Sequence, residues 1–177
     1  MNPDAEEIPG DGVDNDCNPD TPDEQPGKTI FITSQTFNGN LGGLEGADAK
    51  CQELADAADL DGTFKAWLSD SETDARDRLT HATVPYRLVD GTTVADDFTD
   101  LTDGSLDAPI NRTENGTAVG DRPWTGTDFA GEACFQATGG TCVLMDPTDG
   151  TIPRLACEDW TTTEGWTWPD ETLLVNA

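Results

Sequence analysis

Side chains that could bind a metal ion crowd the N-terminal part of the chain, where oxygen donors recur at almost every second position. Asp14, Asp16, Asn18 and Asp20 stand at relative positions 1, 3, 5 and 7 of one stretch. Calcium takes about six to eight oxygen ligands, and an EF-hand loop uses these offsets because alternate residues turn toward the ion. The predicted calcium ligands of this stretch are Asp11, Asp14, Asp16, Asn18, Asp20, Asp23 and Glu24.

The same stretch departs from the EF-hand pattern at two positions. Pro19 stands where the loop needs glycine, and Gln25 stands where it needs a closing glutamate. A standard EF-hand is therefore excluded, whereas a simpler acidic loop closed by Asp23 or Glu24 is not. The alternative is an acidic, disordered linker, because residues 1–27 show no apolar period and are punctuated by prolines. Copper bound through a soft thiolate at the cysteine of this stretch is a lesser option.

The charge of the chain is strongly acidic, with 36 Asp and Glu against 9 Lys and Arg and a net charge of −27. Such a charge repels nucleic acids and anionic membranes, so we expect no nucleic-acid partner. No apolar run approaches the roughly 20 residues of a membrane span, so we also expect no membrane insertion. The charge suits divalent cations, a salty medium or simple solubility.

The composition changes at Lys28, which divides the chain into two predicted parts. Residues 1–27 form the acidic segment, and residues 28–177 form the folded domain. Five Trp and six Phe supply more large apolar groups than a wholly disordered chain would carry. We therefore expect one domain of ordinary size with its own core.

The start of this domain is predicted to be a strand, a long helix and a second strand. The β-rich run at 28–34 indicates the first strand, and the run at 64–70 indicates the second. Between them, apolar residues recur at steps of three and four over residues 44–58. This period predicts an amphipathic helix with Cys51 on its buried face.

Two local signals follow the second predicted strand. Ser71 stands three residues before Asp74, which is the spacing of a capping box and predicts a short helix. The dipeptide Asp90-Gly91 supplies the positive φ angles of a tight turn and predicts a β-hairpin at 86–95. Further along, we predict mostly loop at 96–121 and a strand at 122–127.

The cysteine pattern favours an exported protein with disulfide bonds over a cytosolic one. The chain has no CxxC pair and a single histidine, which argues against a zinc finger. Because the number of cysteines is odd, at least one thiol is free, has lost its partner, or pairs between chains. The cysteines are Cys17, Cys51, Cys134, Cys142 and Cys157.

The common enzyme signatures are missing, since the sequence contains no GxSxG, no HExxH and no P-loop. The one imidazole, His81, lies in a polar loop and is predicted to be an exposed surface residue. A pair of carboxylates could hydrolyse a glycoside, but among 36 acids the sequence singles out no pair. We therefore predict that the protein is not an enzyme, and a polysaccharide hydrolase is the least favoured function.

Two tryptophans near the C-terminus are predicted ligand-binding residues. Trp166 and Trp168 alternate in the run EGWTWPD and would face the same side of a strand. They either form the core of that face or make an exposed aromatic pair that stacks on sugar rings.

The folded part resembles DUF1554, a bacterial domain of unknown function first described in spirochaete surface proteins. The resemblance covers about residues 28–165. It is carried by FITSQTFNGNLGGLEGADAKCQELADAA, GTFKAWLSDS, RLTHATVPYRLVDGTTVADDFTDLTDGSLDAPINRTENG, WTGT and CEDWTT. That domain is similar to the C-type-lectin-like and endostatin folds. The resemblance implies an α+β, C-type-lectin-like fold with small antiparallel sheets, one main amphipathic helix and long loops.

The N-terminal stretch PGDGVDNDCNPDTPDE separately resembles a MopE-type metal-binding motif of secreted bacterial proteins, of the form DGxDNDCDGxxDE. The chain departs from this form at Asn18-Pro19-Asp20. The resemblance implies calcium as the bound ion.

The DUF1554 resemblance also implies a set of disulfide bonds. Family members usually continue to a closing strand that carries the partner of the helix cysteine, whereas here no cysteine follows Cys157. Either the domain is cut short at its C-terminus, or Cys157 takes the partner role. The preferred pairing is Cys51–Cys157 and Cys134–Cys142, with Cys17 free. The sugar-binding triplets of true lectins are absent, so the lectin sugar site is not implied.

These observations predict a secreted or cell-surface binding module with a calcium-binding acidic loop. Its ligand would be an exposed protein or glycan of a cell surface or matrix. The alternative is a structural subunit of a calcium-stabilised surface filament or layer. In that assembly, a neighbouring copy could donate a missing closing strand.

Overall fold

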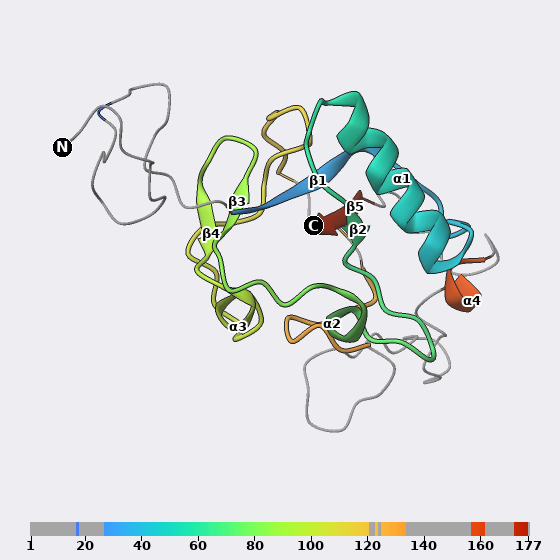
Figure 1. Cartoon of the computed structure of the whole chain (residues 1–177). Helices are drawn as coiled ribbons and strands as arrows, with labels where there is room; N and C mark the ends of the chain where they lie inside the picture. Colours follow the sequence, from blue (N-terminus) through green and yellow to red (C-terminus); the bar gives the residue numbers. More distant parts are fainter. Residues whose placement is uncertain are drawn as a thin grey trace.

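The computed structural model describes the central part of the chain and a few segments around it. The described residues are Cys17, 27–120, Pro123, 125–133, 157–161 and the backbone of 172–176. They form a mixed α and β structure in which one sheet is flanked by helices and long loops (Figure 1). Among the described helices, none combines the length and the apolar composition that crossing a bilayer requires.

The sheet has five strands in the order β2-β5-β1-β3-β4. The long strand β1 pairs antiparallel with β5 and parallel with β3, so the sheet is mixed and the prediction of purely antiparallel sheets is wrong. The parallel pair arises because the chain passes through a helix and a further strand before it returns beside β1, a crossover long enough to restore its direction. The strands are β1 (Lys28–Thr36), β2 (Lys65–Ala66), β3 (Tyr86–Leu88), β4 (Thr93–Ala95) and β5 (Thr172–Asn176).

Strand β5 lies inside the sheet, between β1 and β2. Its Val175 is opposite both Phe31 of β1 and Ala66 of β2. The chain therefore supplies the strand next to β1 from its own sequence. This corrects the suggestion that a neighbouring copy could donate that strand.

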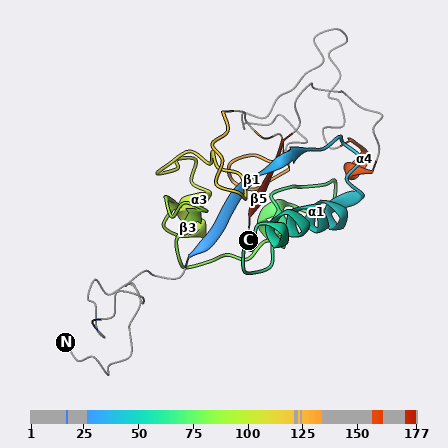
Figure 2. The ribbon, with the colours of Figure 1, turned by 90° about the horizontal axis from the view of Figure 1, so that it is seen from above.

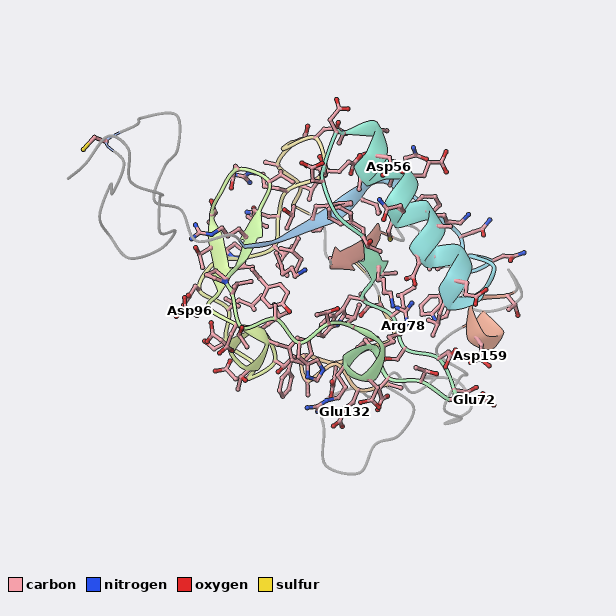
Figure 3. All side chains as sticks on the ribbon, viewed as in Figure 1. Asp56, Glu72, Arg78, Asp96, Glu132 and Asp159 are labelled. Atoms are coloured by element: carbon pink, nitrogen blue, oxygen red, sulfur yellow. The ribbon has the colours of Figure 1, made fainter. Side chains whose placement is uncertain are left out.

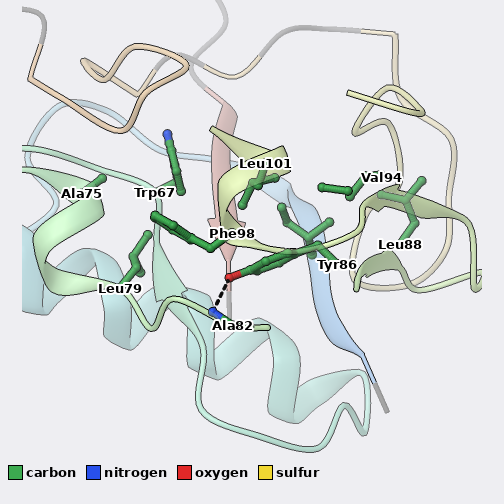
Figure 4. Packing of buried hydrophobic residues seen from close by; sticks show 11 residues of the cluster. Trp67, Ala75, Leu79, Ala82, Tyr86, Leu88, Val94, Phe98 and Leu101 are labelled. Atoms are coloured by element: carbon green, nitrogen blue, oxygen red, sulfur yellow. Dashed lines mark hydrogen bonds between the residues drawn. The ribbon is translucent and has the colours of Figure 1, made fainter. Parts of the chain in front are cut away.

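Residues of β1 alternate between two cores, one on each face of the sheet. Phe31 points to the first core, which α1 covers, and Ile30 points to the second. Figure 2 shows α1 running alongside one face of β1. The first core consists of Phe31, Leu41, Ala47, Cys51, Ala55, Phe64, Ala66, Leu68 and Trp160. The second core, drawn in Figure 4, consists of Ile30, Trp67, Ala75, Leu79, Ala82, Tyr86, Leu88, Val94, Ala95, Phe98 and Leu101.

Helix α1 (Gly43–Ala57) confirms the helix predicted from the apolar period. Its buried residues include Cys51 and Leu54, both on the predicted face. The helix starts after Gly42, which has a left-handed conformation with φ of 86°. Gly46 is required in the first turn, because a Cβ there would lie 2.2 Å from the carbonyl oxygen of Leu41.

The predicted hairpin is confirmed as β3 and β4, but its turn differs in detail. The N–H of Gly91 donates to the carbonyl of Leu88 at 2.9 Å, and the N–H of Leu88 donates to the carbonyl of Thr92. Only Gly91, with φ of 85°, takes the left-handed conformation, whereas Asp90 does not. The loop therefore has three residues and ends in a glycine bulge, instead of the two-residue turn expected at Asp90-Gly91.

Two elements near the second predicted strand are shorter than predicted. Strand β2 occupies two residues of the run 64–70, and α2 (Ala75–Arg78) begins only after Asp74. The predicted capping box is not formed, because Asp74 accepts a hydrogen bond from Ala133 and Ser71 bonds to Asp159 instead.

The predicted loop at 96–121 contains a short helix that the sequence analysis missed. Helix α3 (Phe98–Leu101) starts after Asp97, whose Oδ1 accepts the N–H groups of Thr99 and Asp100. In the run 122–127, the described residues contribute only an isolated bridge between Thr127 and Ala133. A further short helix, α4, spans Cys157–Trp160.

The outer edge of β2 is covered by side chains instead of by another strand. Asp48 of α1 accepts the N–H of Ala66 at 2.9 Å, and Arg78 of α2 donates to the carbonyl of Ala66 at 2.7 Å. The two side chains also form an ion pair at 2.5 Å, with 22 % of the Asp48 side chain and 11 % of the Arg78 side chain exposed. This pair satisfies the backbone of an edge strand and ties it to both helices.

Replacing Asp48 by Ala should lower the free energy of unfolding by about 2 kcal/mol, because Ala66 N–H loses its acceptor and Arg78 loses its counter-ion in a largely buried place. Urea unfolding followed by circular dichroism measures this change. Glu53→Ala is the control, since Glu53 is an exposed acid on the same helix. An equal loss of stability in both variants would contradict this role for Asp48.

Candidate functional site

The predicted N-terminal calcium loop lies almost entirely outside the described residues. Of the stretch 11–24, the structure describes only Cys17, an exposed and free thiol. The predicted ligand-binding Trp166 and Trp168 also lie outside the described residues, as do Cys134 and Cys142. The ligand set of this loop therefore stays a prediction.

Cys51 is a fully buried thiol on the inner face of α1. It is free in this structure, so the bond to Cys157 implied by the family resemblance is not formed here. The backbone of Cys157 begins α4, while its side chain is outside the described part of the chain. Burial raises the pKa of the Cys51 thiol, and the negative charge of Asp48 raises it further. Such a thiol is a poor nucleophile and acts as a core residue.

In the folded protein, iodoacetamide should modify Cys17 more than about tenfold faster than Cys51, because the reagent needs an accessible thiolate. Mass spectrometry of tryptic peptides, with and without urea, measures both rates. Modification of Cys51 should become fast only in urea. A Cys51–Cys157 peptide in a non-reduced digest would instead establish the disulfide implied by the resemblance.

An apolar pocket lies beside α3, with a cavity volume of about 240 Å³. Three residues of the second core, Ile30, Trp67 and Leu101, form its inner part. Trp67 and Leu101 are labelled in Figure 4, where they lie among the packed side chains of that core. The residues that complete the pocket come from two loops and are Gly104, Ser105, Leu106, Ile110 and Phe129.

Phe129 projects from a tight turn that is fastened to α2. Asp128 accepts the N–H groups of Gly131 and Glu132, and Gly131 in turn accepts the N–H of Arg76 at 3.0 Å. Gly131 has φ of 81°, and a Cβ there would lie 2.9 Å from the Cβ of Arg76. The turn therefore depends on glycine, both for its backbone conformation and for its close contact with α2.

The loop after α3 forms the other side of the pocket. At Gly104, with φ of 94°, a Cβ would lie 3.3 Å from the ring of Phe129, so the ring rests against glycine. Asp103 accepts the N–H of Ser105 at 2.8 Å, and Asp107 donates its N–H to Val94 of β4. These bonds hold the loop at both of its ends.

The lining of this pocket is mostly apolar. Its described residues include no ionisable side chain, and their polar side-chain groups are the hydroxyl of Ser105 and the indole N–H of Trp67. Leu106 is 40 % exposed and Phe129 is 60 % exposed, and they are the described large apolar residues that stand out to solvent. Such a lining suits an apolar group.

A second group of interest is a cluster of three carboxylates in the segment 96–107. Carboxylate oxygens of Asp96, Asp100 and Asp107 lie within 4.8 Å of one another. Asp100 belongs to α3, and its Oδ2 accepts the N–H of Asp96 at 2.8 Å. Figure 3 shows Asp96 at the periphery of the molecule, beside α3 and β4. Oxygen donors at this spacing could hold a hard cation such as calcium.

Neither the pocket nor the carboxylate cluster was identified from the sequence. The close spacing of the aspartates over 96–107 was the available signal for the cluster, but a chain with 36 acids contains many similar runs. The pocket had no local signal, because Phe129 meets Leu101 and Ile30 only through the tertiary fold.

His81 is exposed, as predicted. Its ring stacks on Phe98 with 3.9 Å between the centroids, and its Nε2 lies 2.7 Å from the carbonyl oxygen of Arg76. Both contacts place the imidazole on the outside of the second core, where it links α2 to α3.

No known family model matches the chain, and comparison with characterised proteins found no matching sequence. The DUF1554 and MopE-type resemblances are therefore carried by the quoted residues alone and stay predictions.

Proposed function

We propose that this chain is a non-enzymatic binding module that works in secreted form or at a cell surface, with the pocket beside α3 as its ligand-binding site. The observation that carries the proposal is the open apolar pocket with Leu106 and Phe129 exposed at its edge. An exposed apolar patch over a preformed pocket is typical of an interaction site. Full burial of one large apolar side chain contributes roughly 1.5–3 kcal/mol, enough to favour a ligand that covers both residues.

The arrangement of elements supports a C-type-lectin-like frame for this module. One main amphipathic helix covers one face of the sheet, strand β1 pairs with the C-terminal strand β5, and long loops supply the pocket. A binding site carried on loops above a rigid scaffold fits this kind of frame. The frame does not itself name the ligand, which we propose to be an exposed protein or glycan.

Calcium is the proposed cofactor, at two places. The first is the acidic stretch at 11–24, and the second is the cluster of Asp96, Asp100 and Asp107. The support for the second place is geometric, since carboxylate oxygens of the three aspartates lie within 4.8 Å of one another, where a single cation could contact all of them. The large negative charge of the chain raises the local concentration of cations around both places.

A neutral apolar dye, Nile red, tests the pocket, because one end of the dye can enter it while the rest covers the exposed Leu106 and Phe129. Phe129→Ala should weaken dye binding to the full chain by about tenfold, because the variant removes the exposed side of the pocket. Fluorescence titration measures the affinity, and thermal unfolding verifies that the variant is folded. Phe37→Ala is the matched control, since Phe37 packs against the first core instead. Equal dye binding by the wild type and Phe129→Ala would contradict the proposed site.

A calorimetric titration of the full chain with calcium chloride tests the cofactor. We expect binding in the range of about 10⁻⁴–10⁻³ M, as for extracellular calcium modules. Asp100→Asn should reduce the heat from the cluster, and the double variant Asp14→Asn/Asp16→Asn should reduce the heat from the N-terminal loop. Asp56→Asn, an exposed acid on α1, is the control.

Absence of heat in the full chain would contradict the calcium proposal at both places. Sedimentation of the same samples with and without EDTA separates a monomeric binding module from a structural subunit. A calcium-dependent increase in size would favour the surface filament or layer.

A further inference from the structure

The segment that forms one side of the pocket is acidic along its whole length. No Lys or Arg occurs in residues 88–111. Of the described ion pairs, one involves this segment and joins its Asp90 to Arg112, while the other two join Arg76 to Glu132 and Arg78 to Asp48. Besides Asp90, the aspartates of this segment are Asp96, Asp97, Asp100, Asp103 and Asp107, and no described ion pair includes any of these five. The apolar pocket is thus bordered by negative charge with no basic residue of the same segment to neutralise it.

Some of these carboxylates are held close to the pocket itself. Asp103 directly precedes the lining residue Gly104 and is oriented by its bond to the N–H of Ser105. Asp107 directly follows the lining residue Leu106. Both aspartates are exposed, and each adjoins a lining residue in the chain.

The size of the pocket limits what can enter it. Its volume of about 240 Å³ is smaller than the roughly 300–1,000 Å³ of pockets that enclose a drug-sized molecule or cofactor. One aliphatic or aromatic side chain is a better match. A sugar ring is a poorer one, because its hydroxyl groups need several polar partners and the described lining offers only the Ser105 hydroxyl and the Trp67 indole N–H from its side chains.

We propose that the ligand is a basic peptide segment of a partner protein, in which one large aliphatic side chain fills the pocket and flanking Lys or Arg side chains face the aspartates. This inference rests on the proposed function and names the partner of that same site. The aliphatic side chain supplies most of the affinity, because burial of apolar surface is worth more than exposed ion pairs. The charges select basic partners and accelerate their association.

Four labelled peptides test this proposal by fluorescence polarisation with the full chain, in buffer with EDTA so that no calcium ion occupies Asp107. The first is Gly-Lys-Lys-Leu-Lys-Lys-Gly. The second replaces Leu by Ser, the third replaces every Lys by Gly, and the fourth replaces every Lys by Glu. At low salt, we expect the first peptide to bind at least about tenfold more tightly than each of the other three. The advantage of the first over the third should shrink in 0.5 M NaCl, where the Debye length is only a few ångströms.

Variants of the chain then test which of its residues contact the Leu side chain of the peptide and which contact the Lys side chains. Phe129→Ala should weaken the first peptide by about tenfold and leave the weak binding of the Ser peptide unchanged. The double variant Asp103→Asn/Asp107→Asn should remove most of the advantage of the Lys peptide over the Gly peptide. Asparagine at 103 can still accept the Ser105 N–H, so the loop keeps its shape. Glu53→Gln is the matched control, because it neutralises an exposed acid on α1 far from this segment in sequence.

The outcomes separate this inference from the proposed function. Equal binding of the Leu and Ser peptides would mean that charge alone attracts them, and it would overturn the inference. Equal binding of the Lys and Gly peptides, lost in Phe129→Ala, would overturn the basic partner but keep the apolar site. Failure of every peptide would overturn the inference, and if Nile red binding were also insensitive to Phe129→Ala, it would overturn the proposed function as well.

Discussion

The fold depends on the burial of Trp160, which joins segments from distant parts of the sequence. Its indole Nε1 donates to the carbonyl of Ser69 at 2.9 Å, and its own carbonyl accepts the N–H groups of Leu41 and Gly42 at the start of α1. Trp160 has φ of 65°, and the preceding Asp159 has φ of 59°. A non-glycine residue in this conformation costs roughly 1–3 kcal/mol, so the strain persists only because these bonds and the packing of the ring hold it.

Ser69 links Trp160 to the pocket through hydrogen bonds. The Ser69 side chain is fully buried, and its oxygen accepts hydrogen bonds from the N–H of Ala75 and the hydroxyl of Thr127. Ala75 begins α2, and Thr127 leads into the turn that presents Phe129. The first core, α2 and one side of the pocket are therefore positioned by a single connected set of hydrogen bonds. This explains how an exposed residue such as Phe129 can stand at a defined place.

Features set by neighbouring residues were predictable from the sequence, and features set by tertiary contacts were not. The period of α1 and the β-prone residues of β1 and the hairpin gave these elements within a few residues. The length of strand β2 was overestimated because Trp67 and Leu68 are apolar residues that pack into the two cores without being part of a strand. The capping box predicted between Ser71 and Asp74 does not form, because each residue bonds to a partner remote in sequence. Ser71 donates to Asp159, and Asp74 accepts the N–H of Ala133. The pocket was missed for the same reason.

The position of β5 also bears on how the chain reaches its native state. The sheet cannot close until this last strand has entered between β1 and β2, so the central pairing joins residues far apart in sequence. Contacts of this kind slow folding and delay it until β5 has left the ribosome. Until then the sheet stays open, and the edges of β1 and β2 are exposed to wrong partners.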